Sequence, residues 1–234
     1  MTTIDIAAFT AFALCWLIYE PILRRLAGKG GGINLDMAVV REAWLRRMLA
    51  RQNRIVDANL LGHLLSSASF FASTNLLVIA AAAGALFGGE AVLESLRGLT
   101  LVATAPNWLI EAKVALVMVT LARGLLDFIW AIRQLNYCSA LIGAAPEAEE
   151  GKTHAAFARA AADVLHPAFS AFNKGVRAYY FALAAAAWIV SPWAMAVGVI
   201  GAFVILLRRQ TASQAARGIR AARDLLNGEA APPP

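Results

Sequence analysis

The chain has 234 residues, of which 60% are hydrophobic and only 15% are charged, and its formal net charge is +6. Because soluble domains have about 25% charged residues, this composition excludes an ordinary soluble domain and favours one compact membrane unit. The two cysteines, Cys15 and Cys138, are far apart and suggest neither a disulfide framework nor a zinc motif.

Apolar segments long enough to cross a membrane, which takes about 20 residues, occur in four regions. They are residues 4–23, 60–87, 108–132 and 176–207. The first lacks the basic start and the cleavage site of a signal peptide, so we expect it to remain as a helix. The last is interrupted at Ser191-Pro192, where proline removes a helix donor. We predict two short spans there, 176–190 and 193–207, with one bent helix as the alternative.

Charge gives the expected orientation. The 23–59 connection carries eight Lys and Arg residues, residues 208–234 carry five arginines, and nothing basic precedes the first span. The positive-inside rule therefore places the N-terminus outside and the C-terminus in the cytoplasm. Five spans satisfy this rule, whereas four would leave the five arginines of the tail outside.

A basic amphipathic helix is predicted from Asn34, its expected N-cap, to Asn59. Apolar residues recur there at helical spacing, and its basic side chains are Arg46, Arg47, Arg51 and Arg54. We expect this helix to lie in the lipid headgroup layer or against the bundle. Anionic-lipid sensing and the setting of membrane topology are both compatible with it.

The second cytoplasmic connection favours a helix over residues 153–170, interrupted at His166-Pro167. The acidic residues Glu147, Glu149 and Glu150 would favour the start of this helix. Residues 228–234 end in three prolines and are expected to be disordered. The remaining residues, 1–227, should form a single transmembrane helical domain.

The second span carries two polar edges. Gly62, Ser66, Ser69 and Ser73 share one face, and His63, Ser67 and Thr74 lie beside it. One interpretation is close helix packing, in which the hydroxyls bond to backbone carbonyls. The other is a hydrated path or a ligand site.

The third span places five polar or aromatic residues on one face: Thr120, Arg123, Asp127, Trp130 and Gln134. Arg123 and Asp127 can pair at i,i+4, although Asp127 could instead reach Arg133 or Arg177. An ionised side chain at the bilayer centre costs roughly 2.5–3.5 kcal/mol on insertion scales, so this face should point into the bundle. The pair is either a structural ion pair or part of a functional site.

The fourth span places Arg177 and Tyr180 on one side, near the cytoplasmic interface. Basic and aromatic anchors are common at that depth, and we expect Arg177 to snorkel toward water.

Catalytic and metal-binding motifs are not evident. His63, His154 and His166 show no paired spacing, and no nucleophile motif occurs. We predict no catalytic residues, no metal and no cofactor, with His63 as a possible ligand for a bound group. The basic residues do not suggest nucleic-acid binding.

Three blocks of the sequence resemble a bacterial membrane family known as domain of unknown function 599. They are Arg41 to Thr74, containing Trp44 and the run 67–74; Arg133 to Tyr137 followed by residues 143–146; and Asn173 to Trp188. Tyr19-Glu20 fits as well. The resemblance implies an integral inner-membrane protein and supplies no activity, substrate or catalytic residue.

The fold expected is an all-α, polytopic transmembrane bundle. The first functional hypothesis is a small, homo-oligomeric transport-like or channel-like protein that uses the polar faces for an ion or small molecule. The second is a structural or assembly protein that binds membrane lipids or partners through its basic helices. The third is an intramembrane enzyme that uses His63.

Overall fold

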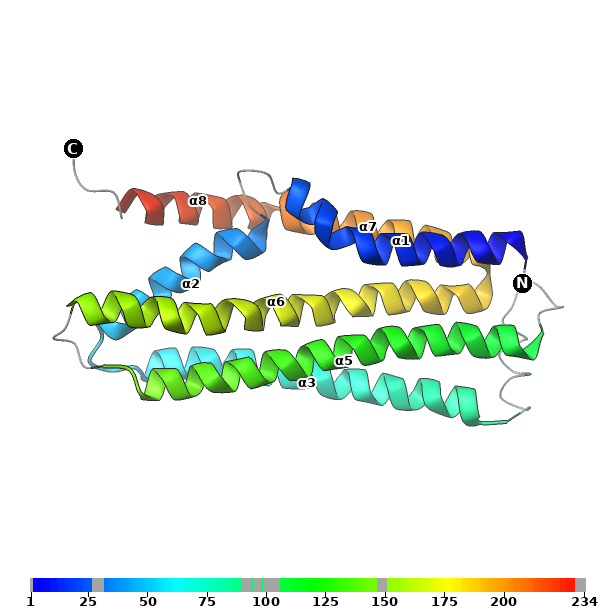
Figure 1. Ribbon diagram of the computed structural model, residues 1–234, viewed down its shortest axis with the longest axis horizontal. Helices are drawn as coiled ribbons and strands as arrows, with labels where there is room; N and C mark the ends of the chain where they lie inside the picture. Colours follow the sequence, from blue (N-terminus) through cyan, green and yellow to red (C-terminus); the bar gives the residue numbers. More distant parts are fainter. Residues whose placement is uncertain are drawn as a thin grey trace. The chain divides into compact units, whose positions relative to one another are not determined.

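The computed structural model describes residues 2–26, 32–89, 106–146 and 151–229, together with Glu94 and Gly98. Over these residues the secondary structure is helical, without strands (Figure 1). The helices are α1 (Thr3–Leu26), α2 (Ile33–Leu49), α3 (Ile55–Phe87), α5 (Asn107–Gly143), α6 (Gly151–Val190), α7 (Pro192–Thr211) and α8 (Gln214–Glu229). The predicted all-α helical bundle is confirmed. Glu147, Glu149, Glu150 and residues 230–234 of the tail lie outside the described residues.

Four stretches of the described residues are long and apolar enough to cross a membrane. They are Thr3–Leu23, Ile55–Phe87, Asn107–Gly143 and Pro192–Gly228. Residues 176–190 belong to α6, which is not among these four, because Lys174 and Arg177 lower the hydropathy of its apolar end. Five spans therefore remain a prediction.

The apolar region 176–207 forms two helices that reverse direction at Ser191, as Figure 1 shows, and not one bent helix. Pro192 occupies the first position of α7, where its missing N–H has no intrahelical partner to lose. The Ser191 hydroxyl caps the new helix by accepting a 3.0 Å hydrogen bond from the Ala194 N–H. The two helices pack closely, since a Cβ at Gly198 would lie 3.3 Å from the Cα of Ala184.

The predicted helix over residues 34–59 is wrong in its limits. It begins at Ile33 with Gly32 as the N-cap residue, and it ends at Leu49. A new helix, α3, then begins at Ile55, where the Asn53 side chain accepts a 2.9 Å hydrogen bond from the Ile55 N–H. Capping by Asn53 explains why the chain starts a second helix there and does not extend the first.

The predicted interruption at His166-Pro167 is also wrong, because α6 is a continuous helix of 40 residues that includes Pro167. Proline costs a helix one backbone hydrogen bond. Leu165, Ala168 and Ala171 are buried on either side of it. Tertiary packing of this face holds the helix together across the proline.

Two compact units make up the chain. Unit 1 comprises residues 1–23, 71–127 and 174–207, and unit 2 comprises residues 24–70, 128–173 and 208–234. Helices α1, α3, α5, α6 and α7 each contribute residues to both. The single domain over residues 1–227 remains a prediction.

The core of unit 1 is built from large side chains of α1, α6 and α7. Phe12, Phe181, Trp188, Met195 and Val199 are all buried in it. The rings of Phe12 and Phe181 meet edge to face with centroids 5.8 Å apart. These contacts fix α1 against the α6–α7 hairpin.

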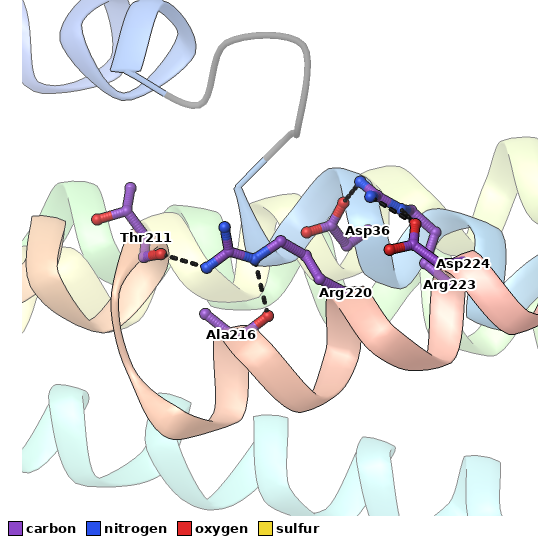
Figure 2. Close-up of polar contacts among 6 residues, drawn as sticks. All are labelled: Asp36, Thr211, Ala216, Arg220, Arg223 and Asp224. Atoms are coloured by element: carbon purple, nitrogen blue, oxygen red, sulfur yellow. Dashed lines mark hydrogen bonds and ion pairs between the residues drawn. The ribbon is translucent and has the colours of Figure 1, made fainter.

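The core of unit 2 contains Met48, Leu49, Leu61 and Leu165, and α2 packs on α8. Figure 2 shows Arg223 of α8 reaching Asp36 of α2, with 2.5 Å between the guanidinium and the carboxylate. Asp36 is buried, so this pair ties the two helices together. In the same view Arg220 donates to the Thr211 carbonyl at 2.7 Å and closes the turn before α8.

Candidate functional site: paired charges and an uncovered helix face

Arg123 and Asp127 form the i,i+4 ion pair considered from the sequence. Their side chains are 3.3 Å apart, with the carboxylate side chain 12% exposed and the guanidinium side chain 54% exposed. Thr120, one turn earlier, is buried and donates to the Leu116 carbonyl at 2.7 Å. This face therefore satisfies its buried polar groups largely within its own helix.

Arg177 does not snorkel freely. It forms an ion pair with Glu20 of α1 at 2.8 Å, and its side chain is only 16% exposed. Its guanidinium carbon also lies 4.9 Å from the centre of the Tyr19 ring. Sequence spacing could not reveal Glu20 as the partner, although Tyr19-Glu20 is one of the family-like segments.

Helices α3, α5 and α6 pack closely together in unit 1, at a three-helix contact that the sequence did not reveal. The buried Asn75 side chain donates to the Leu121 carbonyl at 2.9 Å, and the Tyr179 hydroxyl donates to the Phe71 carbonyl at 2.8 Å. Gly124 lies between the helices, because an added Cβ would be 2.7 Å from the Ala178 Cβ. The Asn75 and Tyr179 side chains therefore form hydrogen bonds between helices around Gly124, a position that has room only for a small residue.

A second set of polar contacts that the sequence did not reveal surrounds Trp188 and includes Asp5 at the start of α1. Asp5 is buried, and its carboxylate accepts a 3.0 Å hydrogen bond from the indole of Trp188. Lys113 is buried too, with its ammonium 5.7 Å from the centre of the same indole. The ring thus lies between an anion and a cation, and these contacts connect α1, α5 and α6.

The hydroxyl face of α3, formed by Gly62, Ser66, Ser69 and Ser73, is mostly uncovered by the other described residues. Ser66 and Ser73 are exposed, as is the neighbouring His63, whereas Ser69 and Thr74 are half-buried. An added Cβ at Gly62 would meet nothing within 4 Å. Close packing within this chain therefore does not explain the face.

Two further predicted site residues lie elsewhere. Gln134, in unit 2, is buried, and its Oε1 has no hydrogen-bond partner among the described residues. Tyr180, in unit 1, packs against the apolar core of that unit. The structure therefore does not gather the predicted polar residues around one point.

The four predicted lipid-facing arginines divide into two pairs. Arg46 and Arg47 lie on α2 and are exposed, and Arg46 forms an ion pair with Glu42. Arg51 and Arg54 follow the end of that helix. Arg51 pairs with the buried Asp57, and Arg54 donates to the carbonyls of Ala145 and Pro146 at 2.8 and 2.6 Å. Lipid contact remains a prediction.

Arg41 and His166 form a contact that the sequence did not suggest. The guanidinium lies 3.3 Å from the His166 Nδ1 and 4.3 Å from the centre of the Phe169 ring. Burial lowers the pKa of Arg41 to about 10, so it remains charged at neutral pH. Burial, followed by the nearby Arg41 charge, lowers the pKa of His166 below its ordinary value.

Metal-binding geometry is not found in the part of the chain that the structure describes. No group of three His, Cys, Asp or Glu side chains there is arranged to hold a metal ion.

Comparison with known proteins gives a family without an assigned activity. Residues 7–215 match the family model described as "Protein of unknown function, DUF599". No curated protein and no solved structure matches the chain. With nearly the whole sequence matched, the chain belongs to the DUF599 family.

Proposed function

We propose that this protein is a five-span protein of the bacterial inner membrane. Unit 1 contains five helical segments of 16 to 21 residues, from α1, α3, α5, α6 and α7. At 1.5 Å per residue these are about 24–31 Å long, close to the hydrocarbon thickness of roughly 30 Å. This match supports a fifth span formed by the end of α6.

The proposed orientation has the N-terminus in the periplasm and the C-terminus in the cytoplasm. Unit 2 carries 16 of the 21 Lys and Arg residues, and all 13 basic residues of the 23–59 connection and the tail belong to it. Under the positive-inside rule these connections are cytoplasmic.

We further propose that the protein functions as a homo-oligomer through α3, and one observation carries this proposal. Large apolar side chains are exposed along the whole helix: Ile55 65%, Phe70 67%, Leu77 70% and Phe87 80%. Its 33 residues span about 50 Å, and even a tilt of about 40° leaves some 38 Å along the bilayer normal. Hydrocarbon covers roughly 30 Å of this, so apolar surface remains that a second copy would bury.

The polar residues of the same helix suggest what this contact does. Gly62, Ser66 and Ser73 lie on the exposed side of α3, between its large apolar residues. Small residues let helices approach closely, and hydroxyls at such a contact can bind water or ions. Gly62 and Ser66 belong to unit 2 and Ser73 to unit 1, so copies that meet along α3 would place these polar groups at the cytoplasmic mouth of a narrow path between them. This arrangement supports a transport-like or channel-like activity.

The alternative is a structural or assembly protein, and a separate observation favours it. In unit 1 four charged side chains are committed to ion pairs, Arg123–Asp127 and Arg177–Glu20. A protein without conduction needs its intramembrane charges only for helix register. Its exposed basic residues Arg46 and Arg47 would then bind lipids or partners.

Cysteine cross-linking tests the α3 contact. Single cysteines replace Ser66 or Ser73 in a background where Cys15 and Cys138 are alanine, and Leu183→Cys is the control because Leu183 of α6 is 72% exposed. We expect oxidised dimers in native membranes for the two α3 positions and far fewer for the control. Equal cross-linking at all three positions would contradict an α3 interface.

Flux through proteoliposomes separates the two functions. Replacing Ser66, Ser69 and Ser73 together by alanine should lower ion permeability at least tenfold and keep the α3 contact, which a cysteine at the exposed Leu77 (Leu77→Cys) then reports by cross-linking. If the Ser66→Cys and Ser73→Cys proteins cross-link but the wild-type protein conducts no ion or small solute above empty vesicles, the assembly function is the better one.

A further inference from the structure

A groove of 350 Å³ lies between α1 and α5 in unit 1. Its walls are almost entirely apolar, with Phe9, Trp16 and Leu17 on α1 and Leu116 and Val119 on α5. Among the described residues that line it, Arg123 alone is charged. The volume falls within the range of small-molecule sites, about 300–1,000 Å³.

The groove has an apolar end and a cationic end. Asp5 of α1 and Lys113 of α5 both lie against Trp188, so these two helices start near each other. Figure 1 shows that they run in the same direction. Phe9 and Leu116 therefore belong to one end of the groove, and Leu17 and Arg123 belong to the other. A ligand that fills it must be apolar over most of its length and anionic at one end.

Arg123 can bind an anion while it remains beside Asp127. A guanidinium has five N–H donors, and the 3.3 Å contact with Asp127 uses only part of this capacity. More than half of the side chain is exposed. Lys174 and Arg177 also act electrostatically on Asp127, and Arg177 pairs with Glu20, so these three cations and two carboxylates together carry a net charge of +1.

The depth of Arg123 in unit 1 suits a lipid headgroup. It follows Asn107, the first residue of α5, by 16 positions, which is about 24 Å along the helix. In a hydrocarbon layer of roughly 30 Å the guanidinium can extend to the nearer interface. With the proposed orientation this is the cytoplasmic leaflet, where anionic lipids present phosphate.

We propose that this groove binds an anionic phospholipid of the cytoplasmic leaflet. One acyl chain lies between α1 and α5, and the phosphate accepts charge-assisted hydrogen bonds from Arg123. A zwitterionic lipid has the same phosphate, but its positively charged ammonium lies next to that phosphate and opposes the contact with the guanidinium. The site depends on membrane insertion in the proposed orientation and not on the α3 contact, so it can fail while the oligomer stands.

Native mass spectrometry of the full chain in micelles tests the site. The protein is offered equal amounts of phosphatidylglycerol and phosphatidylcholine with identical acyl chains. The wild-type protein should retain the anionic lipid about tenfold more, because the ammonium of phosphatidylcholine repels the guanidinium, and Arg123→Gln should reduce this ratio to near one. Arg133→Gln is the matched control, because Arg133 is an exposed arginine of the same helix. An unchanged ratio in Arg123→Gln, or no preference in the wild type, overturns the proposal.

Filling the groove tests the acyl-chain half of the site. Ala13 lines it, so Ala13→Trp should lower the bound lipid severalfold, and Ala13→Leu serves if the larger residue prevents folding. Val197→Trp is the control, since Val197 is 71% exposed on α7. Asp127→Asn should keep or increase phosphatidylglycerol binding, because it removes the competing carboxylate. Lipid retention unaffected by both Ala13 variants, or lost in Asp127→Asn, contradicts the site.

Discussion

Unit 1 holds five of the 21 Lys and Arg residues and six of the 15 acidic residues. Unit 2 holds the other 16 basic residues and the other nine acidic residues. Unit 1 therefore has a net charge of −1 and unit 2 a net charge of +7. In unit 1 the ion pair Arg177–Glu20 links α6 to α1 beside the apolar core, and Arg123–Asp127 pairs within α5. In unit 2 arginines also bind backbone carbonyls, as Arg54 does at Ala145 and Pro146.

The difference shows two uses of the same side chains. Where the surroundings are apolar, each charge requires a nearby opposite charge or a polar ring, because an unpaired ion there is costly. Where the surface is wetter, an arginine can instead close a helix end by binding carbonyls that would otherwise lack partners. Substitutions in the two units should therefore differ in size and in cause.

The largest effect should come from the core of unit 1. Trp188→Ala removes a buried ring and leaves Asp5 without its indole donor, so we expect the free energy of unfolding to fall by about 3–5 kcal/mol. Trp193→Ala, at a tryptophan that is 68% exposed, should change it by less than about 0.5 kcal/mol. Reversible unfolding in mixed micelles measures both, and equal losses would contradict the described core.

The α3–α5–α6 junction should be intolerant of a single added methyl group. Gly124→Ala brings a Cβ to 2.7 Å from the Ala178 Cβ, and overpacking of this kind costs about 1–3 kcal/mol. Gly201→Ala in α7 meets nothing within 4 Å and should be neutral or stabilising by up to about 1 kcal/mol. Thermal unfolding of both variants in one detergent gives the comparison, and a stable Gly124→Ala protein would refute the close approach.

Substitution of a charged residue in unit 2 should lower the free energy of unfolding by a smaller amount. Arg54→Gln removes two hydrogen bonds to carbonyls, and a loss of about 1–2 kcal/mol is expected. Arg46→Gln affects only an exposed pair with Glu42 and should cost about 0.3–0.5 kcal/mol. If urea unfolding ranks these two variants in the opposite order, carbonyl binding is not the role of Arg54.

The smallest effect should be a pH dependence at His166. Because its pKa is lower in the folded protein than the ordinary 6.5, the unfolded chain binds the proton more readily. Stability should be full above about pH 6.5 and decrease as the pH falls through the folded pKa. Arg41 opposes the protonated ring, whereas Asp163 and Glu42 favour it, so the net loss is modest.

Melting temperatures between pH 8 and pH 5 test this dependence. His166→Gln should show a flatter decline than the wild type, and His63→Gln, at an exposed histidine, should keep the wild-type decline. Parallel curves for all three proteins would remove His166 from the explanation.

Sequence patterns revealed the helices and their local contacts because both depend on short spacings. Apolar run length predicted α1, α3 and α5, the proline at position 192 separated α6 from α7, and i,i+4 spacing found Arg123–Asp127. The predicted helix limits were less accurate, because the hydrogen bond from Ile55 to Asn53 and the packing around Pro167 determine where the helices begin and end.

Most polar partners could not be predicted. Glu20 and Arg177 are 157 residues apart, Asp5 and Trp188 are 183 apart, and no local periodicity relates such positions. The same limit applies to the groove, since the apolar residues of α1 become one of its walls only when α5 lies alongside. A side chain's nearest neighbours are decided here by which helices pack together.

The contact between Asp36 and Arg223 has a consequence for biosynthesis. The two residues are separated by 187 positions, and a ribosome that adds about 5–20 residues per second needs roughly 10–40 s to travel between them. During that interval the carboxylate of the nascent chain must remain hydrated or use a temporary partner. A chaperone or the insertion machinery would encounter an unfinished surface there, which is completed only when the last helix is translated.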